Sequence, residues 1–380
     1  MNVLGKEVRR WYSAVSVDWV LFFSTLPILG AGLVTMNSFV GESSFFLRQL
    51  IWVALSLILF FALSFIDFRF LRRTSVQITL FLISCLILLA LFVIGKVVKG
   101  SQSWFDLGFF SFQPSDPVKL VVILLIAKYF SRRHIEIANI RHILVSGSYA
   151  FVIFILVFLQ PDFGSAIVIF LIWLGMVLVS GISKKHLFGV FALGAIAFLV
   201  LWSFVFVPYQ KQRIITFLHP LADIRGAGYN AYQSMIAVGS GQALGKGIGY
   251  GTQSKLKFLP EYETDFIFAA FAEEWGFVGV LGLFLFCGLV IWRILENALH
   301  GGTNFEILYG TGLGILFMSH FIINIGMNIG LLPVTGITLP FMSYGGSHLL
   351  AEFTGLGILM GMRRYRRSAH KEVIEKEIFI

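Results

Sequence analysis

Long apolar segments recur along most of this 380-residue chain, and they constrain its fold more than any other feature. A helix needs about 20 apolar residues to cross the hydrocarbon core of a bilayer. Hydrophobic residues make up 57% of the chain and charged residues only 13%, which excludes the soluble globular class. The sequence therefore predicts an all-α polytopic membrane protein with ten transmembrane helices, centred near Pro27, Leu57, Ile87, Ile123, Ile153, Ile172, Gly194, Leu281, Phe317 and Ile358.

The positive charge of the chain indicates its topology. A formal net charge of +9 could indicate a nucleic-acid partner, but the Lys and Arg residues gather in short clusters between apolar segments, as cytoplasmic loops require. With ten spans, both termini share one side with the clusters Lys6, Arg9 and Arg10; Arg69, Arg72 and Arg73; Arg132, Arg133 and Arg141; Lys184 and Lys185; Arg293; and Arg363, Arg364, Arg366 and Arg367. We therefore predict cytoplasmic termini and no nucleic-acid partner. A single membrane domain covers 1–380, with a helical bundle at 17–364 and a cytoplasmic tail at 365–380.

Four segments with unusual residues fall on the opposite, extracytoplasmic side. They are the loops at 96–116, 160–164, 208–264 and 331–340. The loop at 208–264 is the large extracytoplasmic loop between predicted helices 7 and 8, and it has about 57 residues without an obvious helical pattern. Loops of that length are usually either functional or disordered. We expect this one to be ordered against the membrane, and we expect the functional site on this side.

The stretch QPSDPVKL at 113–120 carries an acid and a base at the start of the predicted fourth span. Asp116 before Pro117 has the form of a helix N-cap followed by proline at the first helical position. Lys119 lies about one turn inside the span, where a cation is costly unless it is paired or faces a polar cavity. Asp116 therefore has a capping interpretation, and Lys119 is either a snorkelling lysine or a ligand for an anionic head group.

Two further charged residues have two interpretations each. Asp162 in the turn QPDFG follows a proline, a common signal for a helix start, so it is either a cap or a polar partner in an outer cavity. Arg48 lies at the outer start of the second span, and it either snorkels toward the head groups or faces the same cavity.

The stretch GSGQALGKGIGYGTQSK at 239–255 is rich in glycine. A Walker A loop needs a glycine five residues before its Gly-Lys pair and a Ser or Thr after that pair. Ser240 and Gly247 occupy these two positions, so the nucleotide interpretation fails. The turn can still hold a phosphate with its backbone N–H groups and Lys246, or it is simply flexible.

Acidic residues gather at the entrance to the predicted eighth span, namely Glu261, Glu263, Asp265, Glu273 and Glu274. On a continuous helix Asp265 lies at the outer mouth, Glu273 lies about 80° round and roughly 12 Å deeper, and Glu274 faces the opposite side. One helix cannot direct all three acids to one site. Asp265 is therefore the candidate functional carboxylate, with capping by Asp265 or Thr264 as the alternative, while Glu273 and Glu274 should pair inside the bundle.

Four motifs on the extracytoplasmic side are similar to those of one known family. They are QPSDPVKL (113–120), QPDFGSA (160–166), the stretch from GYNAYQ to FAEE (228–274) and NIGMNIGLLPVTGITLPFMSYGGS (324–347). In this order they resemble the SEDS family of bacterial cell-wall proteins, which includes RodA, FtsW and SpoVE. The resemblance runs from about Trp19 to Arg364. The short terminal tails and the sequences of the segments 258–269 and 324–337 are most like those of RodA.

The resemblance implies a peptidoglycan glycosyltransferase of the bacterial cytoplasmic membrane that polymerises lipid II for cell elongation and shape. It implies a class B penicillin-binding transpeptidase and other elongation-complex membrane proteins as partners. The family's essential aspartate corresponds to Asp265 and its first outer-loop tryptophan to Trp104. Arg48, Lys119 and Asp162 correspond to polar residues of its outer cavity.

Five positions depart from the family pattern. Asp116 stands where the family usually has Glu, and the proline after it is also unusual, which weakens any ligand role for Asp116. Thr338 stands where proline is common, and Glu263 where histidine is often seen. His348 stands where a small residue is usual.

The expected chemistry joins a sugar hydroxyl of one lipid II molecule to the anomeric carbon of another and releases a lipid pyrophosphate. Asp265 is the candidate general base for the hydroxyl. The candidate cations for the charge that develops on the pyrophosphate are Arg48, Lys119 and Lys246. Asp116 and Glu261 are further candidate contacts to the substrate.

No cofactor or metal site is expected. Both cysteines, Cys85 and Cys287, lie in apolar segments, and no cluster of His and Cys residues has metal-ligand spacing. A divalent cation at the outer face stays open as an additional source of positive charge.

Two other functions remain as alternatives to lipid II polymerisation. A transporter that flips lipid II would also place charged residues within spans, but alternating access favours a site near the bilayer midplane and an internal repeat. A scaffold for the division or elongation machinery would need no chemistry at all. Within the family, an FtsW-like division polymerase is the alternative to a RodA-like one.

Overall fold

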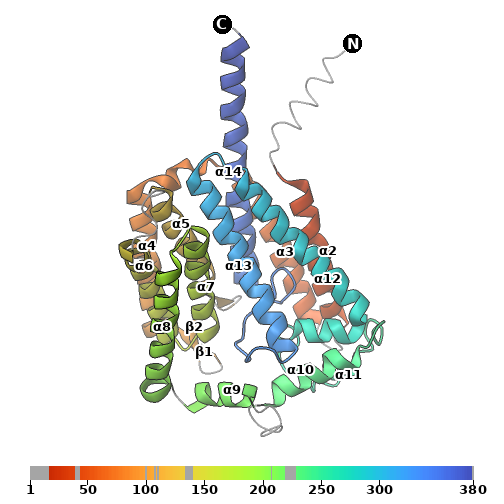
Figure 1. The fold of residues 1–380 in the computed structure, drawn as a ribbon. Coiled ribbons are helices and arrows are strands. Elements are labelled where there is room, and N and C mark those ends of the chain that lie inside the picture. Colours follow the sequence, from red (N-terminus) through yellow and green to blue (C-terminus); the bar gives the residue numbers. More distant parts are fainter. Residues whose placement is uncertain are drawn as a thin grey trace, which may run out of the picture.

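The structure is a bundle of long helices with shorter elements gathered at one end (Figure 1). A computed structural model describes residues 17–38, 43–98, 101–106, 108, 111–132, 140–206, 208–218 and 228–378. The long helices are α2 (Trp19–Asn37), α3 (Ser43–Ser64), α4 (Thr74–Ile94), α5 (Ser115–Ser131), α6 (Ile140–Leu159), α7 (Phe163–Val179), α8 (Lys184–Val200), α12 (Ile267–Leu299), α13 (Asn304–Asn328) and α14 (Gly346–Ile378).

The helical membrane class predicted from the apolar segments is confirmed. All ten predicted span centres lie in these long helices. Among the described residues, seven helices are long and apolar enough to cross a membrane, namely α2, α3, α4, α6, α8, α12 and α13, and α7 is apolar but shorter. The count of ten membrane spans therefore stays a prediction.

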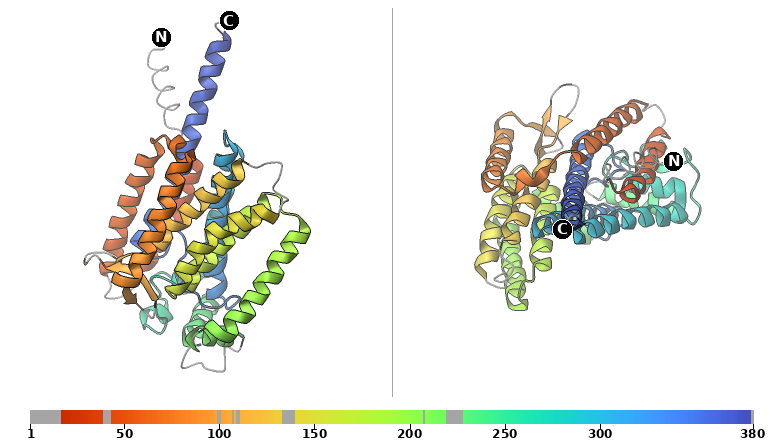
Figure 2. Two further views of the ribbon diagram at one scale, coloured as in Figure 1. Left: turned by 90° about the vertical axis from the view of Figure 1, so that its left-hand side faces the viewer. Right: turned by 90° about the horizontal axis from the view of Figure 1, so that it is seen from above.

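Helix α13 lies at the centre of the bundle (Figure 1), where it contacts α5, α7, α12 and α14. Its approach to α5 and α7 depends on Gly312, because a Cβ at that position would lie 2.7 Å from Ile123 and 2.9 Å from Met176. Small residues allow this kind of close helix packing inside a bilayer. Helix α8 is the opposite case: it lies at the edge of the bundle (Figure 2), and none of its side chains is buried.

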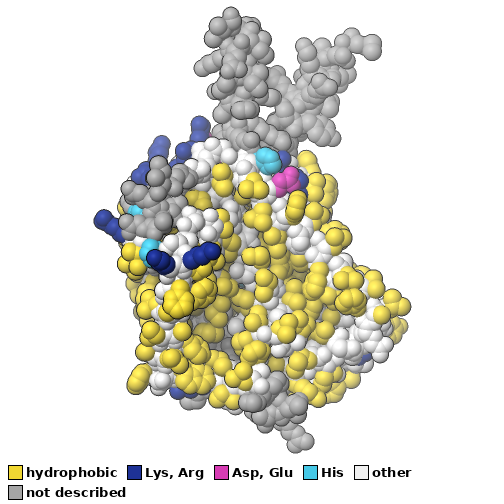
Figure 3. Space-filling view, viewed as in Figure 1, with side chains coloured by type: hydrophobic (Ala, Val, Ile, Leu, Met, Phe, Trp, Pro, Cys, Tyr) yellow, Lys and Arg dark blue, Asp and Glu magenta, His cyan; other side chains and the backbone are white. Residues whose placement is uncertain are grey.

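One end of the bundle, called here the basic end, carries the start of α2, the ends of α5 and α12, and the helix η1 (Phe68–Arg72). Lys and Arg side chains gather at this end in the space-filling view (Figure 3). Asp18, the N-cap of α2, is buried there and accepts from Arg293, with Nη2–Oδ2 2.5 Å. It also forms an ion pair with Arg363, whose Nη1 lies 3.0 Å from Oδ2. Burial raises the pKa of Asp18, but hydrogen bonds from Asn297 and Arg293 outweigh that effect and hold the pKa below its usual value.

The opposite end, called here the loop end, holds the described parts of the segments 96–116 and 208–266 and the segments 160–164 and 331–345. The first of these contains short strands, which the all-α prediction did not include: β1 (Lys96–Val98), β2 (Ser101–Asp106) and β3 (Ser111–Phe112) form an antiparallel sheet in that order. Within 208–264 the chain forms α9 (Pro208–Leu218), α10 (Tyr229–Ser240) and α11 (Thr252–Lys255). The sequence pattern did not reveal these helices, because short amphipathic helices leave little hydropathy signal.

Helix α12 is broken at Gly276, where φ is 64° and ψ is −169°. The break leaves backbone groups without helical partners, and the glycine-rich loop supplies them. Lys246 N donates to the Glu273 carbonyl at 3.0 Å, and Phe277 N donates to the Gln242 carbonyl at 2.8 Å. A chain that breaks at membrane depth needs such partners from protein. The predicted continuous helix was wrong at Gly276. The predicted 80° and 12 Å offset of Glu273 from Asp265 does not apply for another reason, because the helix begins at Ile267 and Asp265 lies outside it.

Candidate functional site

Asp265 lies on the loop end immediately before α12, and its main chain is held from the neighbouring helix α13. The carbonyl of Asp265 accepts from Asn324 Nδ2 at 3.0 Å and from Asn328 Nδ2 at 3.1 Å. Both asparagines are fully buried, and they lie four residues apart on one face of α13. The residue before it is also held, since Ser343 Oγ donates to the Thr264 carbonyl at 2.7 Å. These contacts fix the backbone that carries the carboxylate.

The alternative that Asp265 or Thr264 serves as the N-cap of α12 does not fit the structure. The helix begins at Ile267, and Phe266 occupies the N-cap position. The side chain of Asp265 is half-buried. It lies beside Gly336, where an added Cβ would lie 3.6 Å from Asp265 Oδ2.

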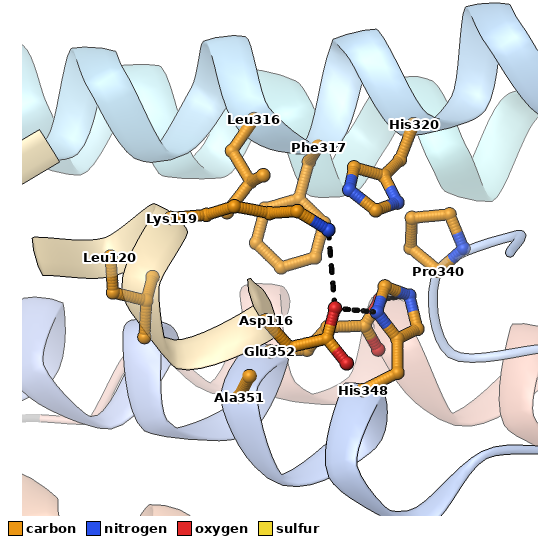
Figure 4. Close-up of a pocket in the computed structure, with 10 residues that line it drawn as sticks. All are labelled: Asp116, Lys119, Leu120, Leu316, Phe317, His320, Pro340, His348, Ala351 and Glu352. Atoms are coloured by element: carbon orange, nitrogen blue, oxygen red, sulfur yellow. Dashed lines mark hydrogen bonds and ion pairs between the residues drawn. The ribbon is translucent and has the colours of Figure 1, made fainter. Parts of the chain in front are cut away.

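A second group of charged side chains lies buried between α5, α13 and α14 (Figure 4). Lys119 Nζ contacts Asp116 Oδ1 at 3.1 Å. His348 lies between two acids, with Nδ1 3.6 Å from Asp116 Oδ1 and Nε2 2.7 Å from Glu352 Oε1. His320 stacks on His348 with ring centroids 5.0 Å apart. We call Asp116, Lys119, His320, His348 and Glu352 the buried cluster.

The structure corrects the prediction that Asp116 caps its helix. Helix α5 begins at Ser115 with Pro114 as the N-cap, so Asp116 lies in the first turn. Its carboxylate points to Lys119 and His348 (Figure 4), and it also accepts from Ser347 Oγ at 3.3 Å. Lys119 is 3% exposed, which excludes snorkelling in this conformation. A buried cation with a paired carboxylate is the arrangement that a low-dielectric interior requires.

The buried cluster surrounds a cavity of about 20 Å³. A water molecule needs roughly 10–15 Å³ measured in this way, so the cavity has room for one water and not for a sugar or a pyrophosphate. The Nε2 atom of His320 is buried without a hydrogen-bond partner among the described residues and is the natural contact for such a water. Within the described part of the chain, no three His, Cys, Asp or Glu side chains converge as ligands for a metal ion.

The segment 336–341 joins Asp265 to the buried cluster. Gly336 lies beside the Asp265 carboxylate, and the Ile337 carbonyl accepts from Asn324 Nδ2 at 2.7 Å. His320 Nδ1 lies 3.3 Å from the Thr338 carbonyl, and Phe341 N donates to Glu352 Oε2 at 3.0 Å. An extended segment of this length spans at most on the order of 18 Å. Both groups therefore belong to one region of the loop end.

Arg48 and Glu261 lie in the same region. The residue after Arg48, Gln49, donates to the Ser343 carbonyl at 3.1 Å, so the start of α3 is fastened to the segment that also holds Thr264. The Arg48 side chain is exposed. Glu261 forms the turn before Asp265 with a positive φ of 51°, and its Oε2 accepts from Thr264 Oγ1 at 3.2 Å.

Trp104 and Asp162 lie on another part of the loop end. Trp104 is on β2, which is tied to the turn at 160–162 by the bond from Gln102 N to the Gln160 carbonyl, 3.2 Å long. Asp162 is the N-cap of α7 and accepts from Ser165 N at 3.0 Å. The capping interpretation of Asp162 is therefore the one that the structure shows, and its second oxygen accepts from Gln113 Nε2 at 2.9 Å.

Lys246 is paired with Glu273 rather than left open as a phosphate ligand. Its Nζ lies 2.6 Å from Glu273 Oε1, and that fully buried carboxylate also accepts from Thr252 N at 2.9 Å and Gln253 N at 3.1 Å. Glu274 accepts from Ser38 Oγ at 2.5 Å and from Gly249 N at 3.0 Å. The expectation that Glu273 and Glu274 pair internally is confirmed.

Comparison with known proteins identifies the family of the chain. A sequence profile for FtsW, RodA and SpoVE, described as "Cell cycle protein", matches residues 11–368. The chain belongs to the FtsW/RodA/SpoVE family. It is 40% identical over 295 residues to "Peptidoglycan glycosyltransferase MrdB" of Escherichia coli (strain K12), covering 77% of this chain and 79% of that protein. It is 35% identical over 367 residues to "Stage V sporulation protein E" of Bacillus subtilis, covering 93% and 98%.

Solved structures agree with the FtsW/RodA/SpoVE assignment. One is described as "Structural coordination of polymerization and crosslinking by a peptidoglycan synthase complex". It aligns with a TM-score of 0.80 at 32% identity, covering 92% of this chain and 98% of the other. The crystal structure of the Thermus thermophilus rod shape determining protein RodA aligns with a TM-score of 0.69 at 30% identity, covering 92% and 97%.

Four residues of this FtsW/RodA/SpoVE protein that shape the site were not singled out from the sequence. They are the supports of Asp265, Asn324 and Asn328, and the cluster members His320 and Glu352. Their position inside apolar helices was a signal in the sequence that could have identified them, because burying polar and ionisable residues there is costly and they usually have a specific partner. The partners themselves lie far away in the sequence.

Proposed function

We propose that this chain polymerises lipid II into glycan strands at the outer face of the bacterial cytoplasmic membrane, for cell elongation, with Asp265 as the general base. The class of enzyme follows from the family, whose curated relatives are named peptidoglycan glycosyltransferases. The observation that carries the role of Asp265 is its placement: buried Asn324 and Asn328 fix its backbone, while its carboxylate stays half-buried at the loop end. A general base needs this combination of fixed position and access to substrate.

In the proposed reaction, the hydroxyl oxygen of the acceptor sugar forms a bond to the anomeric carbon of the donor. The bond from that carbon to the pyrophosphate oxygen breaks, and the Asp265 carboxylate takes the hydroxyl proton. Polyprenyl pyrophosphate leaves with the bonding electron pair. Exposed Arg48 is the best-placed cation for the departing charge, since the start of α3 is fastened beside the Asp265 segment.

Direct contact with substrate is not open to Lys119, Asp116 or Lys246 in this conformation. Each is engaged in an ion pair, and the cavity beside Lys119 is too small for a pyrophosphate. Direct contact with Lys119 therefore requires the buried cluster to open, whereas a supporting role for it does not. Trp104, Asp162 and Glu261 are proposed to line the outer region around the sugar chain.

The proposed topology places the basic end in the cytoplasm and the loop end outside, as supported by the gathering of Lys and Arg at the basic end (Figure 3). In a variant with Cys85 and Cys287 replaced by alanine, a cysteine at exposed Tyr250 should react with an impermeant thiol reagent added to intact cells. A cysteine at exposed Ile140 should react only after the membrane has been permeabilised. Labelling of position 140 from outside would overturn this topology.

The proposed partner is a class B penicillin-binding transpeptidase, together with other membrane proteins of the elongation complex. The similar structure described as coordinating "polymerization and crosslinking by a peptidoglycan synthase complex" supports it. A RodA-like role is supported by the 40% identity over 295 residues to MrdB, the RodA protein of Escherichia coli, against 36% over 297 residues to a relative named FtsW.

The deciding experiment supplies purified protein in detergent with labelled lipid II and follows glycan length on a gel. We expect glycan strands to lengthen with time. A lipid II transporter and a scaffold would both leave the substrate as monomer, because detergent removes the membrane that a transporter must cross. Addition of the partner transpeptidase should increase the rate, and a preparation that stays inactive with that partner present would refute the proposal.

A further inference from the structure

A second polar hollow lies at the basic end, opposite to Asp265. It forms where the end of η1, the end of α5 and the start of α13 meet, and its volume is about 480 Å³. Sites for small molecules typically have volumes of ~300–1,000 Å³. Arg72, Lys128 and Arg132 line one side of the hollow, and residues 302–305 at the start of α13 line the other. We call this the basic hollow.

Lys128 lies close enough to the other two cations of the basic hollow to be repelled by both. The charges of Arg132 and Arg72 both act on Lys128, whose amine donates to the Arg72 carbonyl. Among the described residues that line the hollow, none is acidic. Glu306 lies in the first turn of α13, and its Oε2 accepts from Gly302 N at 2.8 Å, so it caps the helix start. The described lining therefore carries positive charge that an anion would balance.

The start of α13 adds to this positive field. Helix α13 has 25 residues, and its N-cap Thr303 makes no side-chain capping bond. Thr303 is partly buried and lines the hollow, and its Oγ1 has no hydrogen-bond partner among the described residues. The first backbone N–H groups of a helix carry a partial positive charge and are suited to hold an anion.

We propose that the basic hollow binds a phosphate-bearing anion, supplied either by the head group of an anionic phospholipid or by a free phosphate ester. Two arginines can each donate two N–H groups to phosphate oxygens, and a lysine adds a point charge. The buried ring of Phe305 gives the hollow an apolar side. Basic pockets between helices on the cytoplasmic side of membrane proteins are suited to lipid head groups. This proposal does not depend on the chemistry at Asp265.

The test measures the concentration of added ligand that gives half of the maximal thermal stabilisation of the full-length protein in detergent. Short-chain phosphatidylglycerol is compared with short-chain phosphatidylcholine, and glycerol phosphate and inorganic phosphate are tested alone and as competitors. Phosphatidylglycerol should stabilise the protein at a lower concentration than phosphatidylcholine. Arg72→Gln and Arg132→Gln should each raise the required concentration about fivefold, since a basic residue near the surface contributes about 1 kcal/mol.

Arg73→Gln is the matched control, because Arg73 is exposed and adjacent to Arg72 but does not line the hollow. Lys128 is left unchanged because its bond to the Arg72 carbonyl supports the fold. If glycerol phosphate competes as well as the lipid does, the anion is a free phosphate ester; if only the lipid binds, it is a head group. Equal effects of Arg73→Gln and Arg72→Gln, or equal stabilisation by both lipids, would overturn the proposal.

Discussion

Asp265 and Asp116 are two acids of the loop end that the fold holds in opposite ways. For Asp265 the main chain is fixed by two buried asparagines, and the carboxylate is half-buried. For Asp116 the carboxylate itself is held, by Lys119, His348 and Ser347, and it is 5% exposed. A group that must take a proton from a substrate needs the first arrangement. The second arrangement is suited to holding helices α5 and α14 together.

The two regions are joined by one segment, 336–341, so the buried cluster can support the reacting carboxylate without touching substrate. Its contacts run from Gly336 beside Asp265 to Phe341 N on Glu352. This arrangement predicts a separation of effects. Changes at Asp265 should reduce turnover, and changes in paired acids should reduce stability first.

The largest expected effect is that of Asp265→Asn on turnover. The amide keeps the shape of the side chain but cannot take a proton, and general-base catalysis typically contributes ~10²–10⁴ in rate. Polymerisation of lipid II in detergent should fall by about that factor, while the thermal unfolding temperature stays near that of the unchanged protein. A near-normal rate would show that Asp265 is not the base, and Glu261 and Asp162 would then be the acids to test.

Glu273→Gln should show the reverse pattern. Removing one charge of a buried ion pair typically costs about 3 kcal/mol, and here the carboxylate also holds the backbone of Thr252 and Gln253. We expect a clear fall in thermal stability with nearly normal turnover of the folded protein. Glu274→Gln is the matched comparison, with a smaller loss because Glu274 has no cationic partner among its described contacts. Lost turnover at unchanged stability would place Glu273 in the reacting site.

Lys119 tests the distinction between the reacting site and the buried cluster. It pairs with Asp116 in the buried cluster, and it is also a candidate cation for the pyrophosphate. Lys119→Met removes the cation of the buried Lys119–Asp116 ion pair and leaves Asp116 with His348 and Ser347, which should cost about 2–3 kcal/mol of stability. The double variant Lys119→Met with Asp116→Asn should recover most of that loss. If Lys119 serves only the buried cluster, the double variant also recovers turnover. If it binds pyrophosphate, stability returns but the half-saturating lipid II concentration stays high.

The sequence predicted the helical segments well, because hydropathy is a local property and bilayer thickness sets the length of each segment. It also identified Asp265, Asp116 and Lys119 as unusual, since charges are rare in such segments. It failed where partners are distant: the contact between Asp116 and His348 joins residues 232 positions apart. It also failed at Gly276, because one glycine in an apolar run does not reveal a break. The groups that hydrogen-bond to the backbone at this break lie in the loop at 242–247.

The smallest expected effect is that of Gly336→Ala, which tests the segment that joins the two regions. Gly336 has a φ of +77°, where a side chain costs about 1–2 kcal/mol. The new Cβ would lie at an ordinary contact distance of 3.6 Å from Asp265 Oδ2, so it should not displace the carboxylate. We therefore expect a loss of stability in that range and less than roughly a tenfold loss of turnover. Gly282→Ala, on α12 with no atom within 4 Å of the added Cβ, is the control and should lose neither. A loss of turnover as large as that of Asp265→Asn would mean that the segment 336–341, rather than the asparagines of α13, decides where the carboxylate lies.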